Sequence, residues 1–411
     1  DRRGRAALEA AVEAALAEMN DGTGSYEHVE EDICRADDLD GVEALLTGAT
    51  GLVGGRLVGE LLGQEGGAIA CLVRAPTLAA GRARVAAALA RHGVTRGLER
   101  VRVVLGDLEA PGLGLGAATW RGLAERVRRI VHGGARVHLI APFEALAPAN
   151  LRGTAALLGL ARAGRRVPTF TLISTLSVFV SAEPRVARPS EDDDLAGTAA
   201  VIGGYAQSKW AAEALVRRGA PPLPTICARL GLITGDVASG RGGEQDQLTL
   251  FLRGLAELGA APEGIEGLRV DVTPVDFAAA ALARLIAADP GAEAIATYHV
   301  ASARGASGAD LVAALRAEGA RVEVIPAGRF LERGAAARSP AAALAYLALC
   351  RRIAGAGEPL RGYDLFLSTG FDFDMTRADA VLARHGLRCP EATPALLRRY
   401  VRAARAEGGR A

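Results

Sequence analysis

The stretch VEALLTGATGLVGGRLVGELL, residues 42–62, decides the fold. Its first six residues form an apolar run that predicts a β-strand, and residues 52–62 have the apolar spacing of a helix. Three glycines lie between them: Gly48 allows a tight turn, Gly51 lets the backbone approach a pyrophosphate, and Gly54 lets the helix pack closely on the strand. A bare glycine triplet is a weak signal in a chain with 51 glycines. The strand before it and the helix after it favour a nucleotide-binding loop over an ordinary turn.

The same alternation of strand and helix continues outward from this loop. Short apolar runs predict further strands at residues 68–73, 100–105, 128–132, 169–174 and 224–230. Amphipathic segments between them predict helices at residues 79–91, 119–127, 149–163 and 205–217. This order is typical of a parallel sheet covered on both faces. We therefore predict an α/β fold, a Rossmann-like doubly wound parallel sheet with a smaller, mostly helical C-terminal substrate-binding subdomain.

A chain of 411 residues is too long for one ordinary core, so we expect more than one unit. Residues 1–41 contain one helical pattern and are expected to be a linker helix and lead-in. We assign residues 42–235 to the Rossmann domain, with residues 269–300 returning to it. Residues 236–268 and 301–411 are expected to form the substrate-binding cap.

Composition and charge exclude several classes of protein. The formal net charge is +1 with acids and bases interspersed, unlike the basic face of a nucleic-acid-binding protein. The five cysteines are scattered without a CxxC pair, which favours buried thiols over disulfides or a metal site. No uncharged apolar run is long enough to span a membrane, and no signal peptide opens the chain. We expect a cytoplasmic protein without metal.

The residues after the second and third strands bear on which dinucleotide would bind. Arg74 ends the second strand, at the position where an acidic residue usually binds the ribose of NAD. An arginine there favours the 2′-phosphate of NADP, and Arg84 could supply a second contact. Asp107, after the third strand, is placed either to meet the adenine edge or to cap a turn. NADPH is the expected cofactor.

Lys209 is the single lysine in the chain, beside 47 arginines among the 48 basic residues. It lies four residues after Tyr205 in YAQSKW, so both side chains share one face of a predicted helix. An ammonium there stabilises a phenolate and would lower the high pKa of a tyrosine. A compact ammonium does this better than a guanidinium fork. The pair predicts acid–base catalysis at the nicotinamide end of the sheet.

Two other polar residues complete the predicted catalytic site. Thr175, at the end of the fifth strand, would pair its hydroxyl with Tyr205 to hold developing negative charge, with Ser174 and Ser177 as competitors. Asn150, in PANLRGT, either supports the lysine through its amide or caps a helix turn.

These motifs resemble the extended short-chain dehydrogenase/reductase superfamily: TGATGLVG, GDL, the Ser-Thr pair before SVF, and YAQSK. More narrowly, the chain is similar to the thioester reductase domains that terminate non-ribosomal peptide synthetases and polyketide synthases. The narrower resemblance rests on CLVRA, VLGDLEAPGLGL, RIVHGGARV, APANLRGT, GGYAQSKWAAEALV, RLGLITGD and TPVDFAAAAL, in order over residues 42–285.

The resemblance implies NADPH-dependent reduction of a thioester on a phosphopantetheine arm to an aldehyde, which a second NADPH could carry on to an alcohol. It puts Thr175, Tyr205 and Lys209 in the catalytic positions. It also puts the following residues on the cofactor: Gly48, Thr50, Gly51, Leu52, Val53, Gly54, Arg74, Arg84, Asp107, Leu108, Gly134, Ala135, Asn150, Gly231 and Leu232. The implied partner is an acyl or peptidyl carrier domain. Because the chain starts at Asp1 rather than Met, we expect a domain of a longer enzyme, monomeric when excised.

Three alternatives remain open at this stage. A nucleotide-sugar epimerase or dehydratase would share the glycine loop, Tyr205 and Lys209, but Arg74 disfavours its usual preference for NAD. A nucleotide-sensing module without turnover has no need of the acid. A free-standing fatty acyl-CoA or carboxylic acid reductase differs mainly in how the thioester arrives.

Overall fold

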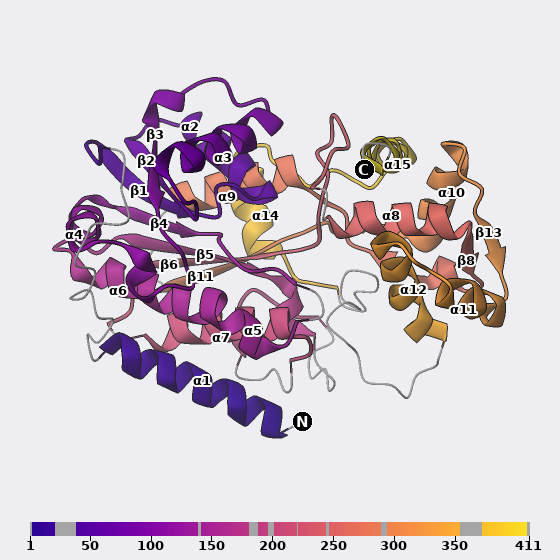
Figure 1. Ribbon diagram of the computed structural model, residues 1–411, viewed down its shortest axis with the longest axis horizontal. Helices are drawn as coiled ribbons and strands as arrows, with labels where there is room; N and C mark the ends of the chain where they lie inside the picture. Colours follow the sequence, from indigo (N-terminus) through magenta and orange to yellow (C-terminus); the bar gives the residue numbers. More distant parts are fainter. Residues whose placement is uncertain are drawn as a thin grey trace.

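The computed structural model describes residues 2–20, 38–138, 141–180, 188–195, 201–219, 221–243, 246–288, 294–353 and 372–408. Within them, a sheet of seven parallel strands has the order β11-β6-β5-β4-β1-β2-β3 (Figure 1). The strands are β1 (Val42–Thr47), β2 (Ala68–Val73), β3 (Val101–Leu105), β4 (Arg129–His132), β5 (Thr169–Thr175), β6 (Thr225–Leu230) and β11 (Ile295–Val300). The strand order changes direction between β3 and β4: β2 and β3 lie on one side of β1, and β4, β5, β6 and β11 follow one another on its other side. This change of direction creates a crevice beside β1 at the carboxyl ends of the strands.

Helices cover both faces of this sheet (Figure 1). One face carries α2 (Leu52–Leu62), α3 (Leu78–Arg91), α9 (Val275–Ala287) and α14 (Thr376–Ala383). The other carries α4 (Ala117–Arg126), α5 (Phe143–Ala147), α6 (Gly153–Ala163) and α7 (Gly204–Arg218). The N-terminal helix α1 (Arg2–Asn20) packs on the outer side of α6 and α7, so it forms a further layer beyond the sheet.

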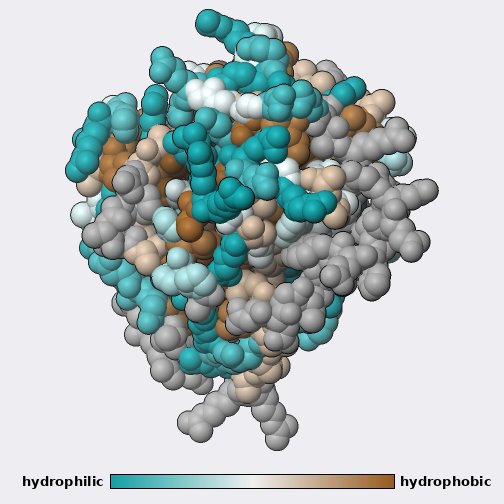
Figure 2. Space-filling view, turned by 90° about the vertical axis from the view of Figure 1, so that its left-hand side faces the viewer, coloured by the Kyte–Doolittle hydropathy of each residue, from teal (hydrophilic) through white to brown (hydrophobic). Residues whose placement is uncertain are grey.

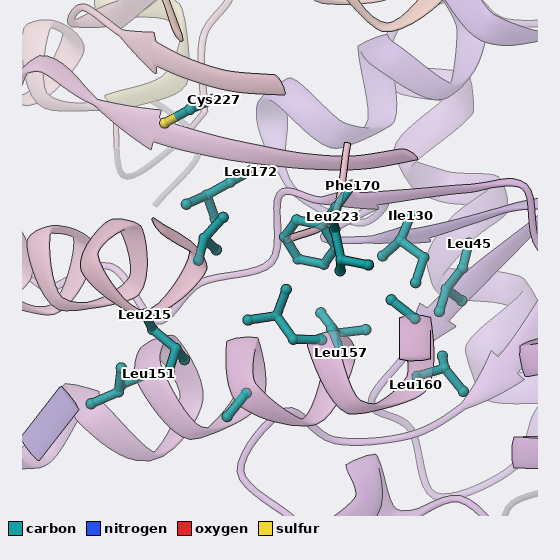
Figure 3. Close-up of a cluster of buried hydrophobic side chains, with 14 of the residues drawn as sticks. Leu45, Ile130, Leu151, Leu157, Leu160, Phe170, Leu172, Leu215, Leu223 and Cys227 are labelled. Atoms are coloured by element: carbon teal, nitrogen blue, oxygen red, sulfur yellow. The ribbon is translucent and has the colours of Figure 1, made fainter. Parts of the chain in front are cut away.

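The main core lies between the sheet and the layer of α6 and α7 (Figure 3). Phe170 and Leu172 of β5 point from the sheet toward Leu157 of α6 and Leu215 of α7, and all four are buried. A second cluster fills the opposite side of the sheet under α2 and α9. All six residues of β2 are buried, as expected for a parallel strand that is covered on both faces. This packing makes the edge of the sheet a rigid platform.

A separate cluster of buried apolar residues lies in the C-terminal part of the chain. It is built from α8 (Gln247–Leu258), α10 (Gly308–Ala317), α11 (Ala327–Ala335), α12 (Pro340–Ile353) and α15 (Pro394–Gly408). Three two-stranded pairs accompany these helices: β7 (Ile233–Thr234) with β10 (Thr273–Pro274), β8 (Ala260–Pro262) with β13 (Glu323–Ile325), and β9 (Arg269–Val270) with β12 (Ala306–Ser307). This unit lies to one side of the sheet, toward the right in Figure 1.

The predicted fold class is confirmed: the structure has the doubly wound parallel sheet and a smaller, mostly helical C-terminal unit. The predicted strands match β1 to β6 within one residue at each end. The domain boundaries stay a prediction. One segment within the expected cap behaves differently, because α14 packs against α9 and β11 rather than against the C-terminal helices.

The surface farthest from the C-terminal unit is mostly hydrophilic, and its apolar residues form separate small areas (Figure 2). None of the helices in the described part of the chain combines the length and the apolar character that crossing a membrane requires.

Candidate active site

A cavity of about 860 Å³ lies at the carboxyl edge of the sheet. Its walls come from the residues that end β1, β2, β5 and β6, from the residues that follow β3 and β4, from the glycine loop, and from the start of α7. Of the eighteen residues that the sequence places at the site, seventeen line this cavity: Gly48, Thr50, Gly51, Leu52, Val53, Gly54, Arg74, Arg84, Asp107, Leu108, Gly134, Ala135, Thr175, Tyr205, Lys209, Gly231 and Leu232. Residues that are up to 184 positions apart in the chain, from Gly48 to Leu232, therefore surround one space.

The glycine loop is held so tightly that two of its glycines admit no side chain. Gly48 has φ +84°, and a Cβ there would lie 2.8 Å from the backbone of Gly133. A Cβ on Gly54 would lie 2.0 Å from the carbonyl oxygen of Gly48. The following helix α2 starts after Gly51 without a side-chain cap, which leaves N–H groups of its first turn for an anion. The loop has the shape that a pyrophosphate requires.

Arg74 and Asp107 lie at one end of the cavity. The Arg74 guanidinium is 3.8 Å from the Asp107 carboxylate, and its side chain is 71% exposed. Asp107 also accepts a hydrogen bond from the backbone N–H of Glu109 at 2.9 Å, so it caps a turn while lining the cavity. The Arg84 guanidinium donates to the carbonyl oxygen of Arg74. Two arginines thus stand next to the end of β2, where the ribose of an adenosine would lie.

Tyr205 and Lys209 project from consecutive turns of α7 into the opposite part of the cavity. Lys209 is only 2% exposed, whereas Tyr205 is half-buried. Burial lowers the pKa of the Lys209 ammonium to about 8, although the nearby Glu213 carboxylate acts to raise it. Glu213 is itself held by Arg229 at 2.9 Å, and neither side chain is exposed.

The expected depression of the Tyr205 pKa is not found. Burial raises the pKa of this phenol to about 12, because the phenolate loses its hydration in the cavity wall. The desolvation of the phenolate outweighs any attraction to the ammonium of Lys209. A phenol that keeps its proton at neutral pH is suited to the role of a proton donor.

Thr175 differs from its two competitors in how its hydroxyl is bonded. Its Oγ1 accepts hydrogen bonds from the backbone N–H and the hydroxyl of Ser177, at 3.2 Å and 3.0 Å. Among the described residues none accepts the Thr175 proton, so it is available to an acceptor in the cavity. The hydroxyl of Ser174 donates to Glu213 instead, and that of Ser177 is used on Thr175. These bonds favour Thr175 over both serines.

Asn150 is the one predicted residue that does not line the cavity. It is 1% exposed and lies in a π-helical turn, Pro148–Arg152, that leads into α6. Its amide donates to the hydroxyl of Ser208 at 2.8 Å and pairs in both directions with the backbone of Arg136. The amide therefore contacts the neighbours of the site rather than the Lys209 ammonium.

Sequence reasoning missed several residues of the wall. Asp271, far along the chain, accepts hydrogen bonds from the backbone N–H groups of Leu232 and Ser302, and burial raises its pKa to about 6. Asp246 and Gln247, at the start of α8, also line the cavity. An isolated aspartate, in a region where glycines interrupt the apolar patterns, belongs to no recognisable motif. Only the folded chain therefore reveals these contacts.

Comparison with known proteins agrees with this geometry. The model of the NAD-binding family described as male sterility protein matches residues 46–282, more than half of the chain. The chain belongs to this family. It is an oxidoreductase of the extended short-chain dehydrogenase/reductase superfamily, as the motifs predicted, and its family indicates a nicotinamide dinucleotide as cofactor.

Two curated relatives are much longer than the chain. It is 33% identical over 296 residues to one subunit of the linear gramicidin synthase of Brevibacillus parabrevis, covering 70% of the chain and 6% of that protein. It is 31% identical over 329 residues to the L-2-aminoadipate reductase large subunit of Eremothecium gossypii, covering 75% of the chain and 24% of that protein. The chain thus spans less than a quarter of each relative's length.

A solved structure matches over most of its length. The terminal R domain from the myxalamid PKS-NRPS biosynthetic pathway superposes with a TM-score of 0.76 at 29% sequence identity. The match covers 89% of this chain and 91% of that domain. The likeness therefore includes the C-terminal helical unit as well as the sheet.

Proposed function

We propose that the chain is an NADPH-dependent thioester reductase that releases an acyl or peptidyl group from a carrier protein as an aldehyde. The observation that carries the proposal is the gathering of Thr175, Tyr205 and Lys209 in the same cavity as the glycine loop. The likeness to the terminal R domain, and to a gramicidin synthase and an aminoadipate reductase, supports this reaction class.

A dinucleotide fits the cavity, since the loop around Gly48 and Gly54 has no room for a Cβ and the first turn of α2 has no side-chain cap. When bound, the cofactor supplies a hydride to the thioester carbon. Tyr205 donates its proton to the carbonyl oxygen, and Thr175 donates a hydrogen bond to the same oxygen as negative charge develops. Lys209, charged below its pKa of about 8, stabilises that charge and binds hydroxyl groups of the cofactor.

The first product is a hemithioacetal, in which the former carbonyl carbon carries the hydride, a hydroxyl and the sulfur. The hydroxyl then returns its proton to the Tyr205 phenolate as the pantetheine thiolate leaves, which gives the aldehyde and restores the phenol. The thiolate is a fair leaving group because thiols ionise near pH 8.5. A second hydride transfer would give an alcohol. The proposed partner is the carrier domain that presents the thioester, and the preference for NADPH is proposed from Arg74 and Arg84 at the end of β2.

The test is oxidation of NADPH by the purified chain with acyl-pantetheine, acyl-CoA and acyl-carrier thioesters, with mass spectrometry of the products. Tyr205→Phe and Lys209→Met should each lower kcat at least about 100-fold, the range expected for loss of positioned acid–base groups. Tyr400→Phe is the matched control, because this phenol donates to the carbonyl oxygen of Gly235 outside the cavity. Near-normal rates in Tyr205→Phe would reject the assignment. A preference for acyl-CoA over the carrier would identify a free-standing acyl-CoA reductase.

A further inference from the structure

His132, the last residue of β4, lies behind the cavity wall rather than in it. It is 1% exposed, and both ring nitrogens are hydrogen-bonded to threonine hydroxyls. Nδ1 is 2.8 Å from Oγ1 of Thr47, at the end of β1, and Nε2 is 3.0 Å from Oγ1 of Thr154, in α6. The ring therefore connects two strand ends to a helix on the other side of the core.

The direction of each hydrogen bond follows from the number of protons that each hydroxyl has. Thr154 donates its single proton to the carbonyl oxygen of Asn150 at 2.6 Å, so toward His132 it can only accept. Nε2 of His132 must then carry the ring proton, and Nδ1 must accept one from Thr47. The oxygen of Thr47 in turn accepts from the backbone N–H of Gly134 at 2.9 Å. These bonds select one neutral tautomer.

The chain of hydrogen bonds continues from Asn150 to the helix that carries the catalytic pair. The Asn150 amide donates to Oγ of Ser208 at 2.8 Å, and that hydroxyl donates to the carbonyl oxygen of Tyr205 at 2.7 Å. Gly134, Thr47 and Tyr205, at the two ends of this hydrogen-bond chain, line the cavity, whereas His132, Thr154, Asn150 and Ser208 are buried behind it.

We infer that His132 is a positioning residue for the proposed reductase site: its neutral Nε2–H tautomer holds α7, with Tyr205 and Lys209, in register with the loop at Gly134. The inference rests on the proposed function of the cavity. A second proton on the ring would put an N–H at Nδ1 against the hydroxyl proton of Thr47 and break the order of the chain. Burial and the charge of Lys209 lower the pKa of His132 to about 3, so the ring stays neutral near pH 7.

The first experiment cuts the chain of hydrogen bonds at two separate places. His132→Phe keeps a ring but removes both nitrogens, and Ser208→Ala removes the contact to Tyr205. Each variant should lower kcat about 10- to 100-fold through misplacement of the phenol, while the Kd of NADPH changes less than about threefold. The kcat of the double variant should be no lower than that of the slower single variant, because both substitutions interrupt the same chain of hydrogen bonds. The inference would be overturned if the fold losses of kcat in the two single variants multiplied in the double variant, or if His132→Phe kept the wild-type kcat.

Thr154→Val and Thr225→Val form a matched pair of buried, nearly isosteric changes. Thr154 belongs to the chain of hydrogen bonds, whereas the hydroxyl of Thr225, at the start of β6, donates to the carbonyl oxygen of Leu223, away from that chain. Both variants lose stability, but only Thr154→Val should lose kcat. The pair also keeps the inference testable if His132→Phe does not fold. Equal kcat in the two variants would overturn it.

Nitrogen NMR of the histidine rings gives a readout that does not require turnover. The resonances of His132, assigned by their change in Thr154→Val, should report a neutral ring protonated at Nε2 from pH 5 to 8. A ring protonated at Nδ1, or at both nitrogens at pH 6, would contradict the inference. If wild-type protein fails to oxidise NADPH, the proposed function fails, and the tautomer still decides whether the chain of hydrogen bonds exists.

Discussion

Lys209 shows at the residue scale why one lysine stands among 47 arginines. Its side chain is buried, and Glu213, one turn further along α7, already accepts hydrogen bonds from the guanidinium of Arg229 on both carboxylate oxygens. A second guanidinium fork at position 209 would compete for that carboxylate. A slender ammonium leaves the Glu213–Arg229 pair intact and still carries a charge into the cavity.

Arg74 is the residue on which the proposed preference for NADPH depends. Arg74→Glu should raise the KM for NADPH about 10- to 100-fold, the equivalent of losing a charge-assisted hydrogen bond of about 1.5–3 kcal/mol. The KM for NADH should change much less, since NADH lacks the 2′-phosphate. Steady-state kinetics with both cofactors measures the ratio of the KM for NADPH to the KM for NADH. Arg121→Glu, on the remote helix α4, is the charge-matched control. An unchanged ratio would show that Arg74 does not contact the phosphate.

Helix α14 shows at the scale of elements how a distant segment is attached to the sheet. The carboxylate of Glu191 accepts hydrogen bonds from the backbone N–H of His299, in β11, at 2.9 Å. It also accepts from the N–H groups of Arg377 and Ala378, at 2.6 Å and 3.0 Å, in the first turn of α14. One side chain thus caps this helix and fastens it to the edge strand.

Glu191→Ala should therefore lower the free energy of unfolding by about 3 kcal/mol, because three N–H groups lose a charged acceptor. Asp192→Ala is the control: this neighbour is 79% exposed and pairs with the Arg377 guanidinium at the surface, where such pairs contribute about 0–1 kcal/mol. Urea unfolding gives both values, and hydrogen exchange at Arg377 and Ala378 locates the effect. Equal losses in the two variants would remove the capping role of Glu191.

Buried neutral histidines affect the stability of the whole molecule. Burial lowers the pKa of His132 to about 3 and that of His299 to about 4. Below pH 6.5 the unfolded chain binds protons at these residues that the folded chain does not, so stability falls as the pH falls. Asp271 acts in the opposite direction, since its folded pKa of about 6 means that it binds a proton first in the folded state.

The loss between pH 7 and pH 5 should amount to about 2 kcal/mol for each histidine, because pH 5 lies about 1.5 units below the unfolded pKa and one unit is worth about 1.4 kcal/mol. His299→Phe isolates one contribution. Urea unfolding at the two pH values should show a smaller loss in this variant than in the wild type, by about 2 kcal/mol. The same loss in both proteins would mean that the pKa of His299 does not differ between the folded and the unfolded chain.

The sequence by itself determined the fold class and most of the cavity wall. Both depend on local patterns: an apolar strand, a glycine turn and a helix start within 21 residues at 42–62, and the i, i+4 spacing of Tyr205 and Lys209. In a parallel sheet, residues that follow the strands meet at one edge whatever their separation in the chain. For this reason the order of strands and helices was enough to place Arg74 and Thr175 at the site, whereas Gly231 was placed there by the family resemblance.

Only the tertiary structure decided what lies behind that wall and how its groups titrate. His132, Asn150 and Ser208 carry no motif that links them, and Glu191 reaches a helix more than 180 residues later. The raised pKa of Tyr205 is likewise opposite to the sequence expectation, because desolvation depends on packing from several elements at once. Hydrogen-bond partners and burial are properties of the assembled core, and spacing along the chain does not encode them locally.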